Sequence, residues 1–346
     1  MKFAAYFDSS IPVTKERDRG DVLRETIGLA ELVEDLGLDG VFFPEHHFTA
    51  EGYDPVPMTM CAAIATRTKR VAIGTNVLLL PLHHPLHVIE QAAVIDQIAG
   101  GRFHLGLGLG YRPGENEAFG IDRATRGSRM DEGLAIIRSY LQGERFSFEG
   151  RHFQLHDVEP VLQPVTGSAM PLWVGARASR AGTRAGRFGC SLIIGTSHVP
   201  YNEYVTALRE NGFDLATRSL GASRSVYVSD TDDAAWEEAG DELFYEARVA
   251  REWYSGAGDI AGDRLPPYET TEQRRRVAKM IGSPETVARD IIELHSRFQS
   301  EVRLDWLFFN PRPACLDIAL VNRSLRLFAE EVVPRVNQAL DRLPAR

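Results

Sequence analysis

Residues 38–48, Leu-Asp-Gly-Val-Phe-Phe-Pro-Glu-His-His-Phe, decide how this sequence is interpreted. The apolar run 41–43 predicts a short strand, which the proline at position 44 ends. That strand delivers Glu45, His46 and His47 at its C-terminal end. In a barrel of alternating strands and helices, catalytic side chains lie at that end of the strands. Histidine also exchanges protons near neutral pH, so the stretch predicts an active-site strand if the chain forms such a barrel.

Strand-like runs alternate with amphipathic helical stretches along nearly the whole chain. Such alternation indicates parallel strands joined by crossover helices, so we expect an α/β protein, a closed (β/α)8 TIM barrel that spans 1–346 as one domain. An open doubly wound sheet is the alternative, but the segment 7–10 lacks the Gly-rich turn that usually follows its first strand. The expected strands are 2–7, 39–43, 71–79, 102–109, 171–175, 190–194, 224–229 and 304–309, and the expected helices are 22–37, 57–68, 84–98, 126–142, 178–187, 200–211, 232–256, 284–298 and 315–335.

Two insertions interrupt this alternation. Residues 144–170 contain two short alternating runs around Glu149-Gly150, which predicts a β-hairpin. Residues 255–275 are rich in Gly and Pro and precede the last helix–strand unit. Long insertions at barrel loops often close over an active site, so we expect a lid-like segment there.

Composition excludes several classes of partner. The formal net charge is -9, which argues against binding of nucleic acid or of an anionic membrane surface. No run approaches the roughly 20 apolar residues of a membrane span. The three cysteines fit no zinc or redox spacing and are expected to be small buried side chains. Because the N-terminus begins directly with a strand-like run instead of a signal peptide, we expect a cytoplasmic protein.

The run 102–111 places glycines at alternate positions. Side chains alternate between the two faces of a strand, so Phe103, Leu105, Leu107 and Leu109 should face the helices, and 104, 106, 108 and 110 should face the barrel interior. A glycine-lined inner face favours a bound planar ring. The alternative is that the glycines only let two backbone segments pack closely.

Two further strand ends carry candidate ligand-binding groups. Asn76 lies late in an apolar run, where an amide could hold the edge of a heterocycle or bond to local backbone. Gly175 to Ser179 join a strand to a helix, whose N-terminal N–H groups bind anions, and Arg177 could assist. Arg126, Arg129 and Glu132 recur at a spacing of three, and Arg129 can reach Glu132 on the same helix. A solvated helix face explains this pattern, and so would an arginine turned toward the site entrance.

A metal centre is not expected. His46 and His47 are adjacent, but the sequence shows no i, i+4 histidine pair and no nearby Asp/Glu–His cluster. His83 and His84 lie beside a proline and are interpreted as surface or loop residues, one of which could open the next helix.

Six segments together resemble the bacterial luciferase-like flavin monooxygenases. They are Glu45-His46-His47-Phe48, Gly74-Thr75-Asn76-Val77 with Leu80-Pro81, Gly101-Arg102-Phe103, Gly110-Tyr111 with Phe119-Gly120, Trp173-Val174-Gly175, and Gly282-Ser283-Pro284-Glu285-Thr286-Val287. Their order and spacing match that family over essentially the whole chain.

This resemblance implies a two-component monooxygenase. Reduced FMN would be supplied by a separate flavin reductase, and one oxygen atom of O2 would enter a small organic substrate through a flavin hydroperoxide. His46 matches the family's active-site histidine and His47 would assist it, while Asn76-Val77 matches a non-proline cis peptide beneath the flavin ring. The cofactor-binding residues implied are Glu45, Asn76, Val77, Gly108, Gly110, Tyr111, Gly175, Ala176, Arg177, Ala178 and Ser179.

Alternatives remain within this resemblance. Gly108 and Ala176 replace luciferase's reactive cysteine and an acidic residue near the phosphate, which argues against light emission. A deazaflavin-dependent hydride-transfer enzyme shares the barrel, and some relatives bind flavin without turnover. Phe7, Phe43, Phe48, Tyr53 and Tyr111 suggest an apolar substrate pocket.

A homodimer is also expected, because the family pairs through the helices after its early strands. The predicted helix 57–68 carries Met58, Met60, Cys61 and Ile64, more apolar side chains than a solvated helix needs.

Overall fold

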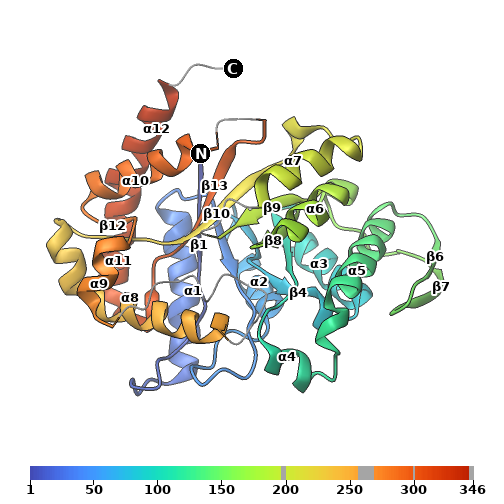
Figure 1. Ribbon diagram of the computed structural model, residues 1–346, viewed down its shortest axis with the longest axis horizontal. Coiled ribbons are helices and arrows are strands. Elements are labelled where there is room, and N and C mark those ends of the chain that lie inside the picture. Colours follow the sequence, from blue (N-terminus) through green and yellow to red (C-terminus); the bar gives the residue numbers. More distant parts are fainter. Residues whose placement is uncertain (196–199, 256–268, 299–300, 343–346) are drawn as a thin grey trace.

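The structure is a computed structural model that describes residues 1–195, 200–255, 269–298 and 301–342. Its centre is a closed ring of parallel strands, in which the first strand pairs with both the second and the last (Figure 1). The third position of the ring holds two short strands, β3 and β4, which both pair with β5. The ring contains β1 (Lys2–Tyr6), β2 (Gly40–Phe43), β3 (Ala72–Thr75), β4 (Leu78–Leu79), β5 (Phe103–Gly108), β8 (Leu172–Ala176), β9 (Ser191–Ile194), β10 (Leu220–Ser225) and β13 (Leu304–Asn310). The predicted eight-position TIM barrel is therefore confirmed.

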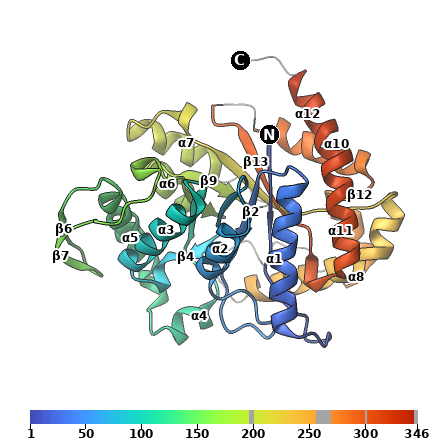
Figure 2. The same cartoon turned by 180° about the vertical axis from the view of Figure 1, so that it is seen from behind.

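Helices surround this ring, and Figure 2 shows three of the early ones, α1 to α3, along its outer side. Local sequence explains where several begin: Asp18 caps α1 through the N–H of Asp21, and Ser283 caps α10 ahead of Pro284. The helices are α1 (Arg19–Asp35), α2 (Pro57–Ala65), α3 (Pro85–Ala99), α4 (Pro113–Ala118), α5 (Arg126–Leu141), α6 (Ser179–Arg187), α7 (Pro200–Glu210), α8 (Asp232–Ser255), α9 (Thr271–Val277), α10 (Pro284–Ser296), α11 (Ile318–Leu327) and α12 (Val333–Asp341).

The expected helix 315–335 is present, but it begins at Ile318 and contains a π-helical turn. A π-helical turn at Phe328–Val332 separates α11 from α12, which continues to Asp341. Pro334 has no N–H to donate to the preceding turn, and a π turn is a common way to accommodate such an interruption.

The alternation predicted for β5 is confirmed within the strand, whereas Leu109, just after its end, is only partly buried and also lines a cavity at the strand ends. Phe103, Leu105 and Leu107 are fully buried in the main core between strands and helices. On the other face, His104 lies among Phe42, Trp173 and Trp306 inside the ring. Burial among these rings lowers the pKa of His104 to about 3, so it stays neutral and belongs to the packed interior.

One strand was predicted four residues too late. The barrel strand β10 ends at Ser225, whereas the expected strand was 224–229. The β-prone residues Val226 to Val228 instead supply β11 (Tyr227–Val228), which pairs with β12 (Ile281–Gly282) outside the ring. Propensity identified the more apolar segment and missed the barrel strand, which has small residues at Gly221 and Ala222.

The two insertions had different outcomes. Residues 144–170 do contain an antiparallel hairpin of β6 (Phe146–Glu149) and β7 (Gln154–Val158), as predicted. The expected lid 255–275 falls mostly on 256–268, outside the described residues, and α9 begins at Thr271.

The inference drawn from the apolar helix 57–68 was wrong. Met58, Met60, Cys61 and Ile64 are at most 7% exposed, so the barrel itself buries them and they offer no surface to a partner. The three cysteines are buried and unpaired, as expected. None of the helices in the described ranges is both long enough and apolar enough to span a membrane.

Candidate active site

A cavity of about 330 Å³ lies at the C-terminal ends of the barrel strands. Its size falls within the roughly 300–1,000 Å³ that ligand pockets occupy. Helix α8 lines one side of it through Tyr245, Glu246 and Trp253. Figure 1 shows α8 at the same end of the barrel as α4. Of the predicted site residues, all but His47 and Ser179 line this cavity: Glu45, His46, Asn76, Val77, Gly108, Gly110, Tyr111, Gly175, Ala176, Arg177 and Ala178.

The Asn76–Val77 segment, whose peptide bond is cis, lines the cavity. This segment separates β3 from β4. The close approach of this segment to β5 requires glycine at two positions. A Cβ on Gly106 would collide with the Thr75 carbonyl oxygen, and a Cβ on Gly108 would collide with the Val77 side chain. The alternative interpretation of the glycine run, close packing of backbone segments, therefore explains Gly106 and Gly108 directly. The Val77 side chain, which packs against Gly108, is itself part of the cavity lining.

His46 is held by two hydrogen-bond partners and three aromatic rings. Its Nδ1 lies 2.9 Å from Glu115 Oε1, and its Nε2 lies 3.2 Å from the Tyr111 hydroxyl oxygen. The rings of Tyr53, Tyr111 and Trp253 surround the imidazole with centroids 4.9–5.2 Å away. The side chain is 11% exposed, so its orientation in the cavity is fixed.

These partners define which nitrogen of His46 can take a proton. Burial would raise the pKa of Glu115, but hydrogen bonds from His46 and the His47 N–H, together with Arg112, lower it. An ionised Glu115 accepts the proton of Nδ1, which leaves Nε2 as the acceptor in the neutral imidazole. Burial raises the pKa of Tyr111, so its hydroxyl stays protonated and donates to Nε2. The arrangement can therefore accept or return a proton at Nε2.

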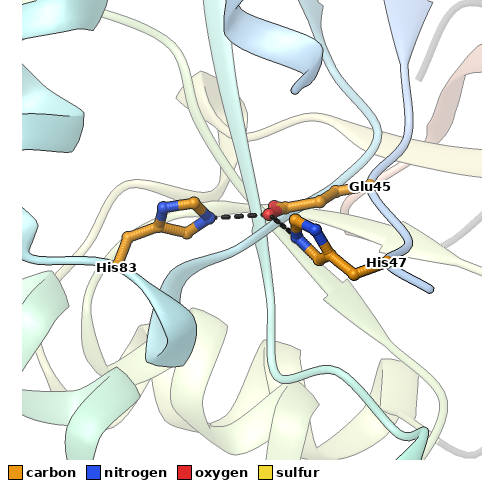
Figure 3. A group of neighbouring side chains, drawn as sticks. All are labelled: Glu45, His47 and His83. Atoms are coloured by element: carbon orange, nitrogen blue, oxygen red, sulfur yellow. Dashed lines mark hydrogen bonds and ion pairs between the residues drawn. The ribbon is translucent and has the colours of Figure 1, made fainter. Parts of the chain in front are cut away.

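Glu45 joins two other histidines, as Figure 3 shows. Its Oε1 lies 2.7 Å from both His47 Nε2 and His83 Nε2, and its Oε2 accepts the Leu79 N–H at 2.5 Å. Burial would raise the pKa of Glu45, but these hydrogen bonds lower it to about 2. Glu45 is thus an ionised carboxylate that ties the end of β2 to the segment after the cis peptide.

The fold therefore creates a Glu–His cluster that the sequence did not reveal. His83 was interpreted as a surface or loop residue, yet its ring contacts the buried Glu45. Three such ligand atoms could in principle hold a metal ion. At 2.7 Å, however, the nitrogens contact the carboxylate directly, whereas an ion between them, with bonds of about 2.0–2.2 Å, would push them apart. His84 does open the next helix, because its side chain accepts the N–H of Leu86.

Part of the cavity lining is basic. Arg126 and Arg177 line the cavity beside the N-terminus of α6, and Arg177 stacks over the Tyr254 ring at 4.3 Å. The proposed pair of Arg129 with Glu132 was wrong. Arg129 Nε instead donates to the Pro81 carbonyl at 3.0 Å, and Glu132 accepts backbone N–H groups from Arg151 to Phe153.

The expected aromatic pocket was partly correct. Tyr53 and Tyr111 line the cavity. Phe7 and Phe43 are buried in the main core, and Phe48 is 71% exposed. Sequence reasoning missed Glu115 on the short helix α4. It also missed the cavity face of α8, although the positions 246, 249, 250 and 253 recur at helical spacing.

A parallel barrel with a titratable histidine in a cavity at its C-terminal strand ends defines a barrel enzyme. Residues 1–300 match the family model described as luciferase-like monooxygenase. Over 100% of this chain and 95% of the relative, the sequence is 30% identical to a 4-hydroxyprotoasukamycin monooxygenase from Streptomyces nodosus subsp. asukaensis.

Solved structures agree with this match. Monooxygenase RslO1 from Streptomyces bottropensis superimposes with a TM-score of 0.79 and 26% identity, covering 96% of this chain and 99% of that one. The oxygenating constituent of 3,6-diketocamphane monooxygenase from Pseudomonas putida, solved in complex with FMN, has a TM-score of 0.79 and 22% identity, covering 97% and 99%. The chain belongs to the luciferase-like monooxygenase family. It is an enzyme of the flavin-dependent monooxygenase class.

Proposed function

We propose that the protein is the oxygenase component of a two-component system, which takes reduced FMN from a separate flavin reductase. It would transfer one oxygen atom of O2 to a small organic substrate. The observation that carries this proposal is His46, which is fixed between Glu115 and Tyr111 and lines the same cavity as the cis peptide at Asn76–Val77. When bound, reduced FMN supplies the activation of oxygen, and the protein supplies position and proton transfer.

The cavity fits such a cofactor at both ends. Val77 offers an apolar surface for a planar ring, and the glycine backbones at 108, 110 and 175 surround it without side chains. Arg126, Arg177 and the first N–H groups of α6 would hold the phosphate. Ser179 is the first residue of α6 and does not itself line the cavity. It would therefore contribute only its backbone N–H to the phosphate site.

The two adjacent histidines would have different roles. His46 Nε2 faces the cavity and would act as the acid–base group. His47 bonds to Glu45 and packs against Phe119, outside the cavity lining. We therefore propose that His47 positions Glu45 and the β4 segment, in place of the assisting catalytic role inferred from sequence.

The proposed phosphate site predicts a difference between FMN and riboflavin. Replacing Arg177 with Ala should weaken binding of reduced FMN by about 10- to 100-fold, since a charge-assisted bond contributes roughly 1.5–3 kcal/mol. Binding of reduced riboflavin, which has no phosphate, should change less than about threefold. Anaerobic fluorescence titration measures both affinities, and equal losses for the two flavins would place the phosphate elsewhere.

We also propose a homodimer, through α3 instead of α2. Val94 and Ile98 of α3 are 44% and 49% exposed. Gln97 of the same helix donates to the Gln163 carbonyl, which brings α3 next to the segment that carries the exposed Val161 and Val165. This apolar patch is larger than single scattered side chains. Light scattering should give a mass near twice 38.5 kDa. Ile98→Asp should give the monomer mass, whereas Val277→Asp, also at an exposed apolar position, should not.

The proposed compartment is the cytoplasm. The three cysteines are buried and unpaired, which fits a reducing environment where a reductase and NADH are available.

A further inference from the structure

The cavity has an acidic end that the proposed flavin contacts leave unexplained. Asp8 follows β1, Glu51 follows β2, and Glu246 lies on α8, and all three line the cavity. In the ring of eight strand positions, β1 lies opposite β8, which carries Arg177 at its end. Asp8 and Arg177 therefore follow strands on opposite sides of the ring.

Asp8 and Glu246 are coupled through one amide. Asn310 Nδ2 donates to Asp8 Oδ2 at 3.3 Å and to Glu246 Oε1 at 3.0 Å. Burial and the proximity of Asp8 raise the pKa of Glu246 to about 7, and burial also raises the pKa of Asp8. Asp8 and Glu246 are thus two carboxyl groups held close together, and no positive charge fully offsets their mutual repulsion.

Glu51 adds an oxygen with an unused bonding capacity. The residue is 9% exposed, and its Oε1 accepts the Tyr245 hydroxyl at 3.2 Å. Within the described ranges, its Oε2 accepts no hydrogen bond. A buried carboxylate that lines a cavity with one free oxygen requires a donor from a ligand or from water.

The carboxylates of the acidic end form no direct ion pair among the described residues, and the nearby Arg19 donates instead to the backbone carbonyls of Ser9, Glu51 and Gly52. No Lys or Arg in the described ranges lies within 4.0 Å of the carboxylate oxygens of Asp8, Glu51 or Glu246. Arg312 acts on Asp8 at longer range, but its Nη2 is bonded to Glu25 at 2.5 Å. The charge of Arg274 favours the ionised form of Glu246, but the effect of burial and of Asp8 is larger, so the pKa of Glu246 is still raised.

Aromatic rings enclose the same region. Tyr6, Tyr53, Tyr245 and Trp253 line the cavity with these carboxylates, and the Tyr53 and Trp253 rings are 5.6 Å apart. Carboxylates together with aromatic faces favour an ammonium group over a neutral or anionic one.

We propose that this end binds a cationic group of the organic substrate, a protonated amine or a quaternary ammonium, with Glu51, Glu246 and Asp8 as its counter-charges. The assignment rests on the proposed function, because it takes the basic part of the cavity lining as the flavin phosphate site. It predicts that amines are preferred and that carboxylates and sulfonates are rejected.

Isothermal calorimetry with three benzyl probes tests the proposal without turnover. Benzylamine should bind at least about tenfold more tightly than benzyl alcohol or phenylacetate, a difference of roughly 1.4 kcal/mol. Glu51→Gln and Glu246→Gln should each weaken benzylamine by about tenfold and leave benzyl alcohol within about twofold. Glu144→Gln, at an exposed surface glutamate, should change neither.

The outcomes are distinct from those of the flavin experiments, since no flavin is present. Undetectable benzylamine binding, or alcohol or phenylacetate binding as tightly as the amine, would overturn the proposal. So would unchanged benzylamine affinity in both glutamine variants. Reduced FMN affinity, measured on the same wild-type preparation, shows separately whether the cofactor assignment holds.

Discussion

Replacing His46 with Ala is expected to lower turnover by about 10²–10⁴, the usual contribution of a positioned acid–base group. Nε2 is the proton-accepting atom in the cavity, and Ala removes it without disturbing the barrel core. Binding of reduced FMN should stay within about fivefold, since the proposed contacts come from Val77, Arg177 and backbone. The measurement is the coupled assay with FMN, NADH and a flavin reductase, on a substrate that the wild-type protein oxygenates.

Two controls separate a chemical role from a structural one. His156→Ala, at an exposed position of the hairpin, should retain full turnover. Tyr111→Phe keeps the ring beside His46 but removes the donor to Nε2, so it should shift the pH profile of turnover more than it lowers reduced-FMN affinity. If a stable His46→Ala protein kept full activity, the chemistry would belong to another cavity group, with Tyr111 the nearest candidate.

Replacing Glu45 with Ala is expected to destabilise the protein by about 3–5 kcal/mol, the usual result of breaking a buried charged pair. The change leaves His47, His83 and the Leu79 N–H without their shared acceptor. Urea unfolding at neutral pH should show a lower midpoint with an unchanged slope. Glu144→Ala, at a solvent-exposed position, should have almost no effect.

The effect of Glu45 should also depend on pH in a defined direction. Its pKa is lowered in the folded protein from 4.5 to about 2, so its ionised form stabilises the fold. That stabilisation is fully present above pH 4.5 and is lost as the pH falls toward about 2. The difference between wild type and Glu45→Ala should therefore narrow on acidification. A constant difference would mean that lost packing, and not the carboxylate's charge, explains the variant.

The sequence predicted what depends on local pattern. The apolar run 41–43, ended by a proline, was sufficient to place Glu45 and His46 at a strand end, and the alternation along β5 correctly separated His104 from its apolar neighbours. Helix α4 was missed because six residues, Pro113–Ala118, are too few to show a helical period. Glu115, the partner of His46, was missed with it.

The remaining site depends on contacts between distant residues. Glu45 meets His83 from 38 positions away, and Asn310 meets Asp8 from 302 positions away. No local pattern contains such pairings. The opposite error occurred at α2, where an apolar helix was taken as evidence for a partner although the barrel buries it. The exposed apolar residues Val94 and Ile98 lie on the next helix, α3. Composition alone does not tell which apolar side chains of that helix are buried and which are exposed.

The oxidation of protein-bound reduced FMN tests most directly whether the protein is an FMN-dependent oxygenase. The anaerobic complex is mixed rapidly with oxygenated buffer, and the return of the absorbance of oxidised FMN is followed. We expect the wild-type protein to slow this return by at least about tenfold relative to free reduced FMN, because the enclosed cavity and His46 would control oxygen chemistry at the ring. A return as fast as that of free FMN, in a protein that anaerobic titration shows to be saturated, would contradict the assignment as an FMN-dependent oxygenase.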